Sequence, residues 1–133
     1  MSCESVEVVR QAHDAFNLRD LEALTQLTQP NWVMDWSRSI GPQRGIYQGR
    51  SGAEEWIAAI SEAFESFEVR ALEYIGMGEQ IVVPTQVKGR GRGSGVVVEA
   101  HGATVWELER GKIASLTLYE TKQEALTATG LAE

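Results

Sequence analysis

The second half of the chain constrains the fold most, because it is strand-like sequence interrupted only by short turns. Four segments with the β-branched content and alternation of strands follow one another, over residues 67–77, 80–92, 96–109 and 112–120. Two or three residues that include a glycine separate each segment from the next. Strands joined by such short turns predict an antiparallel meander, which can bury one face and leave the other open.

Two features of residues 80–92 predict that this strand lies at an edge of the sheet. Pro84 has no N–H to donate to a ladder, so it favours an edge position or a bulge. Lys88, Arg90 and Arg92 alternate with glycines and therefore share one strand face. No helix N-terminus follows them, so the pattern favours a charged, solvated edge strand over a phosphate-binding loop.

The first half of the chain is predicted to be mainly helical. Apolar residues at helical spacing mark the first helix: Val9, Ala12 and Phe16. Asp20 follows a break in this pattern and can cap a second helix, which Pro30 ends. A short strand is expected next, over residues 32–36.

Two capping boxes predict the starts of two further helices, because in each a hydroxyl and a carboxylate can satisfy first-turn N–H groups. Ser51 and Glu54 form the first box and mark the start of a third helix. Thr121 and Glu124 form the second box and mark a last helix, which Gly130 ends.

The predicted order segregates helices from strands, which is typical of an α+β fold rather than an α/β fold. A long, strongly twisted sheet of this kind curls. We therefore expect a strongly curved, mainly antiparallel sheet wrapped around the N-terminal helices, with an internal pocket. Residues 1–133 are expected to form a single domain, because no linker-like stretch divides them.

Composition and charge exclude several function classes. The 12 basic and 19 acidic residues give a net charge of −7, which disfavours nucleic acid as a partner. No apolar run approaches the roughly 20 residues that a bilayer needs, so no membrane partner is expected. Cys3 is the single cysteine, which rules out an internal disulfide and a cysteine-based metal cluster. We expect a cytoplasmic protein with no secretory signal, no metal and no cofactor.

Four stretches in the same order and spacing resemble the nuclear transport factor 2-like superfamily, and within it the SnoaL-like branch. They are AFNLRDLEAL, PNWVMDWSRSIGPQRGIYQGRSG, GSGVVVEAHGATVWELERGKI and YETKQEALTATGL. The resemblance implies a cone-shaped α+β barrel and a homodimer formed by packing the open sheet faces. This superfold contains isomerases, dehydratases, cyclases, epoxide hydrolases and binding modules, so it does not fix a reaction.

The catalytic positions of two related enzyme classes are not matched. Ketosteroid isomerases use a tyrosine, a carboxylate base and a protonated acid. The positions that correspond are Ala12, Trp36 with Asp35 one residue short, and Thr104. Polyketide cyclases place an aspartate before the terminal helix, and Thr121 stands there.

Dehydratase relatives use histidines with an aspartate and tyrosines. Such a set could be supplied here by His101, Asp35, Tyr47 and Tyr119. His101 shares strand parity with the glutamates of its segment, however, which favours a position facing solvent or a partner subunit. The second histidine, His13, lies off the apolar stripe of the first helix and is predicted to be at the surface. Asp35 and His101 are therefore the candidate catalytic residues.

Large apolar residues predict the lining of the pocket. The expected substrate-binding residues are Met34, Trp36, Trp56, Thr104, Trp106 and Tyr119. Tyr119 is included because it is expected to share a strand face with Ile113. Such a lining suits a small apolar or aromatic ligand, although tryptophans can also simply fill a core. Arg38, Arg44 and Arg50 flank the loop after the first strand and could attract an anionic or carbonyl-bearing ligand, or be solvated charges.

Two function classes stay open at this point. One is a small-molecule pocket protein that acts as a cofactor-independent isomerase, dehydratase (lyase) or hydrolase, with Asp35 as base or orienting group. The other is a non-catalytic ligand-binding or dimerisation module with the same fold, which the unmatched catalytic positions favour.

Overall fold

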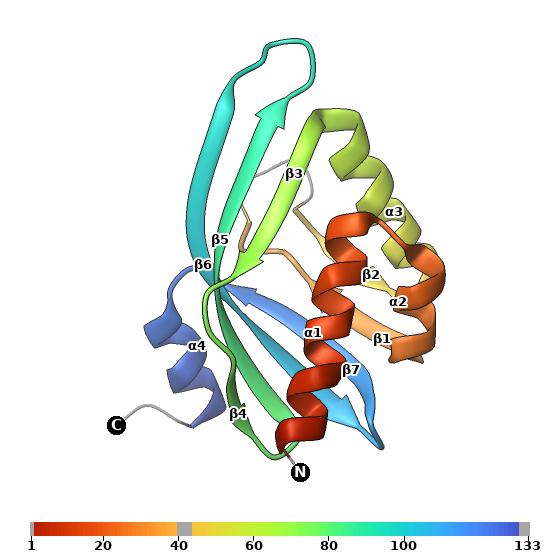
Figure 1. Ribbon diagram of the computed structural model, residues 1–133, viewed down its shortest axis with the longest axis vertical. Helices are drawn as coiled ribbons and strands as arrows, with labels where there is room; N and C mark the ends of the chain where they lie inside the picture. Colours follow the sequence, from red (N-terminus) through yellow and green to blue (C-terminus); the bar gives the residue numbers. More distant parts are fainter. Residues whose placement is uncertain (1, 40–43, 131–133) are drawn as a thin grey trace.

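The computed structural model describes residues 2–39 and 44–130 and confirms the α+β architecture (Figure 1). Its helices are α1 (Ser2–Leu18), α2 (Leu21–Leu27), α3 (Gly49–Ala63) and α4 (Lys122–Thr129). Its strands are β1 (Thr28–Asp35), β2 (Ile46–Gln48), β3 (Phe64–Ala71), β4 (Ile75–Met77), β5 (Gln80–Gly91), β6 (Val97–Glu109) and β7 (Lys112–Tyr119). The strand predicted over residues 67–77 is thus two strands, and β2 was not predicted.

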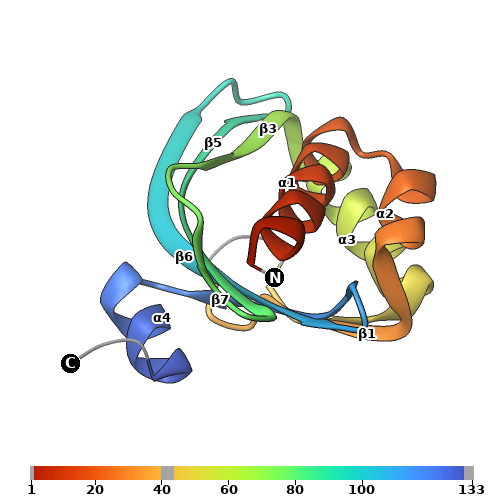
Figure 2. The same cartoon turned by 60° about the horizontal axis from the view of Figure 1, so that its bottom comes forward.

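The strands form one curled, mixed sheet in the order β2-β1-β7-β6-β5-β3, with β4 also paired to β5. The pairs are antiparallel except β1 with β7, which run parallel. The sheet wraps as a half-barrel, with α1 lying in its concave side and α4 on its convex side (Figure 2). We call these the inner and outer faces of the sheet.

The edge position predicted for residues 80–92 is wrong, because β5 lies between β6 and the β3/β4 pair. Pro84 is tolerated there because its neighbour is interrupted. β3 ends at Ala71, opposite Thr85, and β4 begins at Ile75, opposite Val82. Pro84 faces this gap, where its carbonyl accepts from the N–H of Leu72 at 2.9 Å and no ladder bond needs its missing N–H.

The basic side chains of residues 88–92 do not protect an exposed strand edge, as was predicted. Lys88 pairs across the ladder with Glu99 of β6, and their charged groups lie 3.6 Å apart. Arg92 donates to the carbonyls of Ser61 and Phe64, at the end of α3. Lys88 therefore forms an ion pair between two neighbouring strands, and Arg92 binds the backbone where α3 meets β3.

Two of the three predicted helix caps are confirmed. The Asp20 carboxylate accepts from the N–H of Ala23 at 3.1 Å. The Thr121 hydroxyl accepts from the N–H of Glu124 at 3.0 Å, and Gly130 ends α4 with a left-handed φ of 79°. The cap predicted at Ser51 is wrong, because α3 already begins at Gly49 and its N-cap makes no side-chain bond.

Each face of the sheet carries its own apolar cluster. The inner cluster joins α1, α2 and α3 to the concave face and contains most of the core. The outer cluster is small and packs α4 against β5 and β6 through four buried residues: Val82, Ala103, Val105 and Ala125. Tyr119 packs on this outer cluster, whereas Ile113 belongs to the inner one. The expectation that they share a face is wrong, because a register irregularity opposite Glu107 and Leu108 shifts the alternation of β7.

Candidate functional site

Five of the six predicted binding residues lie together on the inner side of the half-barrel. Met34 comes from β1 and Trp36 directly follows this strand, Trp56 comes from α3, and Thr104 and Trp106 come from β6. Each is 3% exposed or less. Strand alternation brings the β1 and β6 pairs to the same face, and α3 closes over them. The structure places these five residues together and buried, and their role in binding a substrate stays a prediction.

Phe16 of α1 lies in the middle of the aromatic cluster. Its ring centroid is 5.1 Å from that of Trp56, 6.0 Å from that of Trp106 and 6.2 Å from that of Trp32. Trp36 and Trp56 also contact each other, with centroids 5.3 Å apart. The Phe16 side chain of α1 therefore fills the space between the tryptophan rings on the inner side of the sheet.

Some polar atoms of the interior are satisfied within the chain and others are not. The Trp106 indole donates to the Thr104 hydroxyl at 2.9 Å, and that hydroxyl donates to the carbonyl of Val83 at 3.3 Å. Four buried side-chain atoms have no hydrogen-bond partner among the described residues: His13 Nδ1, Trp36 Nε1, Trp56 Nε1 and Thr85 Oγ1. Buried polar groups are normally paired, so these atoms call for an explanation.

The surface position predicted for His13 is wrong. His13 is 5% exposed, and its Nε2 lies 2.6 Å from the carbonyl oxygen of Val69. Burial lowers its pKa below the ordinary 6.5, and the bond to Val69 and two nearby carboxylates oppose this shift only in part. The signal was present in the sequence, because His13 is four residues after Val9 and three before Phe16, on one helical stripe.

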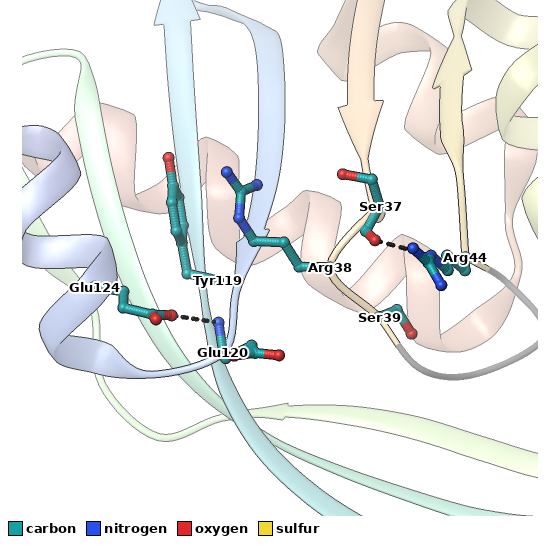
Figure 3. A pocket seen from close by; sticks show the side chains of 7 residues that line it. All are labelled: Ser37, Arg38, Ser39, Arg44, Tyr119, Glu120 and Glu124. Atoms are coloured by element: carbon teal, nitrogen blue, oxygen red, sulfur yellow. Dashed lines mark hydrogen bonds between the residues drawn. The ribbon is translucent and has the colours of Figure 1, made fainter.

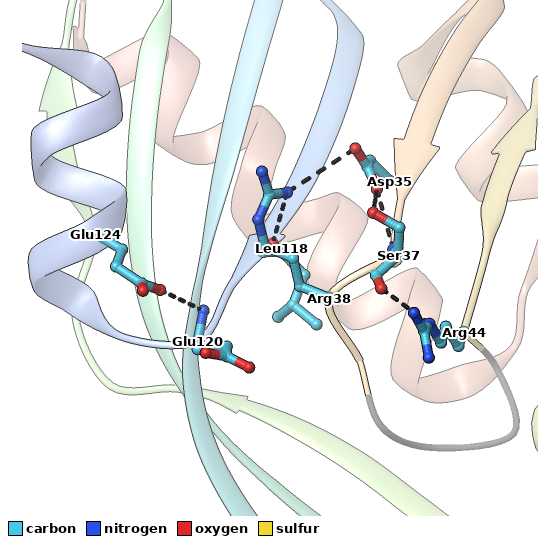
Figure 4. Close-up of polar contacts among 7 residues, drawn as sticks. All are labelled: Asp35, Ser37, Arg38, Arg44, Leu118, Glu120 and Glu124. Atoms are coloured by element: carbon cyan, nitrogen blue, oxygen red, sulfur yellow. Dashed lines mark hydrogen bonds and ion pairs between the residues drawn. The ribbon is translucent and has the colours of Figure 1, made fainter.

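Asp35 lies on the outer face, because it alternates with the inward residues Met34 and Trp36. Its Oδ1 accepts from the N–H of Ser37 at 2.9 Å and from the Ser37 hydroxyl at 2.6 Å, and its Oδ2 is 3.9 Å from Arg38 (Figure 4). Partial burial raises the pKa of Asp35, but the two Ser37 bonds and Arg38 lower it by more, so that it lies below its ordinary value. The Asp35 carboxylate is thus fixed by Ser37 and Arg38, and its lowered pKa makes it a weak proton acceptor.

Next to Asp35, an open cavity of ≈ 530 Å³ lies between the end of β1 and α4 (Figure 3). We call it the outer cavity, and its lining is Ser37, Arg38, Ser39, Arg44, Tyr119, Glu120 and Glu124. The Arg38 guanidinium lies over the Tyr119 ring, 4.6 Å from its centroid. Arg44 donates to the Ser37 carbonyl at 3.1 Å. The structure therefore brings Asp35 and Tyr119 together through Arg38, but on the opposite side of the sheet from the tryptophans.

His101 lies apart from both groups. It is exposed on β6, opposite Gln86, in the part of that strand beyond the Ala103–Tyr119 pair that ends the ladder with β7. The structure does not bring His101 to Asp35.

Within residues 2–39 and 44–130, no group of three or more His, Cys, Asp or Glu residues could hold a metal ion. In the same residues, no helix combines the length and the apolar character that crossing a bilayer demands.

The half-barrel with helices in its concave side defines the class of nuclear transport factor 2-like folds. Within this class the chain belongs to the SnoaL-like domain family, which matches residues 9–116. No curated protein matches the chain.

Solved structures share the fold at low identity. TerC, co-crystallised with polyporic acid, is 16% identical, with 96% of this chain and 97% of TerC covered and a TM-score of 0.77. Bal32a, from a soil-derived mobile gene cassette, is 17% identical over 89% of each chain, with a TM-score of 0.78. A Catenulispora acidiphila protein with a ketosteroid isomerase-like fold, in complex with trimethylamine, is 20% identical over 94% of this chain and 93% of its own, with a TM-score of 0.74. The family fits a small-molecule pocket protein without fixing a reaction.

Proposed function

We propose that this chain binds a small planar molecule on the inner side of the half-barrel, among the tryptophans, with an acceptor oxygen of the ligand facing Trp36 and Trp56. The observation that carries the proposal is the pair of buried indole N–H groups on these two adjacent rings, neither with a partner among the described residues. Relatives of this fold with polyporic acid and with trimethylamine bound support small-molecule binding in general terms.

The free-energy cost of leaving these two N–H groups without a partner favours a ligand that carries a hydrogen-bond acceptor. Leaving a buried donor without a partner costs about 1–3 kcal/mol. A carbonyl or ether oxygen has two lone pairs, so an oxygen of the ligand can accept a hydrogen bond from either of these indoles. The surrounding indole and phenyl faces favour a flat body for the same ligand.

Entry of a ligand requires movement of Phe16 or α1, because the five inner residues are 3% exposed or less and Phe16 lies between the rings. Only molecules in which Phe16 or α1 has moved can bind, so the apparent affinity is lower than the intrinsic affinity by the fraction of such molecules. We therefore expect weak binding of small probes to the wild-type chain.

A titration followed on the indole N–H signals in proton–nitrogen correlation spectra tests the proposal. Tetralone carries a carbonyl on a flat bicyclic body, and tetralin is its carbonyl-free match. Tetralone should shift the Trp36 and Trp56 signals and bind about tenfold tighter than tetralin, as for one satisfied hydrogen bond of about 1.4 kcal/mol.

Two variants and a matched control complete this experiment. Trp36→Phe and Trp56→Phe should each reduce the preference for tetralone, whereas Trp32→Phe, in the same cluster and also buried, should retain it. Equal affinities for tetralone and tetralin, or no binding of either, would show that the interior is only a core.

The outer cavity is a second candidate binding site, favoured by its charges. Arg44 lines the β1 side and Glu120 and Glu124 line the α4 side, with Arg38 held over Tyr119 between them (Figure 3). This separation of charge favours a zwitterionic ligand. In this second proposal Tyr119 acts as a binding residue of the outer cavity, and Asp35, predicted as a base or orienting group, acts through its contact with Arg38.

Free phenylalanine is a suitable probe of the outer cavity. Arg44→Gln should weaken its binding, and Arg50→Gln is the control, because Arg50 contacts Thr25 and Glu22 elsewhere. The catalytic role predicted for His101 has no support from its position and is tested by His101→Gln once a turnover is known.

We also propose that the chain forms a homodimer, as the resemblance implies, and that it acts in the cytoplasm, as expected from the lack of a recognisable secretory signal. Exposed apolar side chains on the hairpin between β5 and β6 support a contact there: Val96, Val97 and Val98, with exposed fractions of 58%, 57% and 43%. Light scattering should report a dimer for the wild type and a monomer for Val97→Lys. A monomeric wild type would contradict this proposal.

A further inference from the structure

The bond between His13 and Val69 fixes which imidazole nitrogen carries the proton. A carbonyl oxygen only accepts hydrogen bonds, so the 2.6 Å contact requires a proton on His13 Nε2. Burial also lowers the pKa of His13, which keeps the ring neutral at neutral pH. In a neutral imidazole the other nitrogen, Nδ1, then has no proton and presents a lone pair. This acceptor is buried and has no partner among the described residues.

His13 points to the same interior as the tryptophans. Its ring centroid is 6.3 Å from that of Trp106, and Phe16, one turn further along α1, is 6.0 Å from the same ring. The groups that face His13 are the Val69 backbone of β3, the Trp106 ring of β6 and the carboxylates of Asp14 and Glu68, which act on it electrostatically. None of the contacts described donates to Nδ1.

Besides His13 and the two tryptophans, Thr85 has a polar atom on the inner side without a hydrogen-bond partner among the described residues. It is 1% exposed and lies on β5 two residues from Val83, a member of the inner cluster. It pairs with Ala71 of β3, two residues along that strand from Val69. Its hydroxyl, which can donate or accept, has no partner among the described residues.

We propose that Nδ1 of His13 accepts a hydrogen bond from a hydroxyl group of the ligand, so that the interior selects planar phenols or enols over the matching hydrocarbons. The inference rests on the proposed function and adds the substrate class. Trp36 and Trp56 supply donors, whereas His13 supplies an acceptor. A ligand that carries both a carbonyl and a hydroxyl on one flat body satisfies all three.

The first test needs no ligand. Long-range proton–nitrogen correlation spectra distinguish the two neutral histidine tautomers, and His101 provides a second signal for comparison. His13 should show a protonated Nε2 and a bare Nδ1 at neutral pH. A proton on Nδ1 would overturn the inference whatever the interior binds.

The second test compares naphthol with naphthalene, which lacks the hydroxyl. The wild-type chain should bind naphthol about tenfold tighter, as for one hydrogen bond of about 1.4 kcal/mol. Naphthol affinity should fall towards that of naphthalene in His13→Gln, because a glutamine amide nitrogen can replace Nε2 as donor to Val69 but leaves no acceptor at the Nδ1 position.

His13→Asn is the matched variant, because an asparagine oxygen can replace Nδ1 but the side chain at position 13 then no longer reaches the Val69 carbonyl, which keeps only its bond from Asn17. It should keep more of the naphthol preference than His13→Gln and lose more stability. Equal affinity of naphthol and naphthalene in the wild type, or a preference unchanged in His13→Gln, overturns the role of His13 and leaves the tetralone result standing. Binding of none of the four probes overturns the proposed function and this inference together.

Discussion

The side chain of Asn17 takes the place of a neighbouring strand at Val69. Its amide nitrogen donates to the Val69 carbonyl at 2.9 Å, and its amide oxygen accepts from the Val69 N–H at 2.9 Å. β3 is the last strand of the sheet, so these backbone groups would otherwise lack a ladder partner. One α1 side chain thus closes the sheet edge and fastens the helix over the interior, and His13 shares the same carbonyl.

Replacing Asn17 should therefore destabilise the protein more than an ordinary polar substitution. Asn17→Ala removes two bonds and leaves part-buried backbone groups without them, at a cost of about 1–3 kcal/mol. Chemical denaturation measures this loss. Asn31→Ala, at an exposed position on β1, is the control and should change the unfolding free energy by less than about 0.5 kcal/mol. Similar effects for the two variants would show that the Asn17 bonds contribute little.

Stability should fall as the pH is lowered from 7 towards 5, because of His13. Its folded-state pKa lies below 6.5, so the unfolded chain binds the proton first and acid favours unfolding. The stabilisation is complete above the unfolded pKa and is lost as the pH falls below it. Denaturation midpoints across this range should drop in the wild type and in His101→Gln, and drop less in His13→Gln. An equal drop in all three would assign the effect to other groups.

Phe16→Ala should separate stability from binding. Removing a buried phenyl ring costs about 3–5 kcal/mol. The same change opens space among Trp32, Trp56 and Trp106, where an apolar ligand can lie. Tetralone affinity should rise while the unfolding free energy falls, and Phe16→Leu should show a smaller change in both. Weaker tetralone binding in Phe16→Ala would place the probe elsewhere.

Asp35→Asn should leave probe binding in the interior unchanged, because this carboxylate lies on the outer face. The wild-type carboxylate has a lowered pKa, so the stability that it contributes is present above the unfolded value of 3.8 and is lost as the pH falls through the folded value. The variant should lack that acid-dependent part. Titration with tetralone and denaturation between about pH 3 and 7 measure both effects. A large loss of tetralone affinity would place Asp35 in the inner site.

The fold could be predicted because its signals are local and repeated. The helical stripe through Val9 and Phe16, the turns between the strands and the cap at Thr121 each specify an element without long-range information. The failures come from contacts between distant segments. Pro84 is interior because β3 stops opposite it, and that depends on a partner strand that the sequence of β5 does not reveal.

The site was only partly predictable for the same reason. Strand parity correctly grouped Met34 with Trp36, and Thr104 with Trp106. One register irregularity in β7 sent Tyr119 to the outer face, and such irregularities leave no clear mark in a sequence. His13 was missed because a lone histidine beside a charged residue is usually solvated, although its spacing from Val9 and Phe16 would have revealed it.

The parallel pairing of β1 with β7 has a consequence for how the chain folds during synthesis. Met34 aligns with Leu116, so β1 gains its β7 neighbour only after residues 112–119 have also left the ribosome. Contacts of such long sequence separation are closed late and slow the folding reaction. Until residues 112–119 emerge, Trp32 and Trp36 lack the sheet against which they pack, so we expect nascent chains released early to be substrates for chaperones.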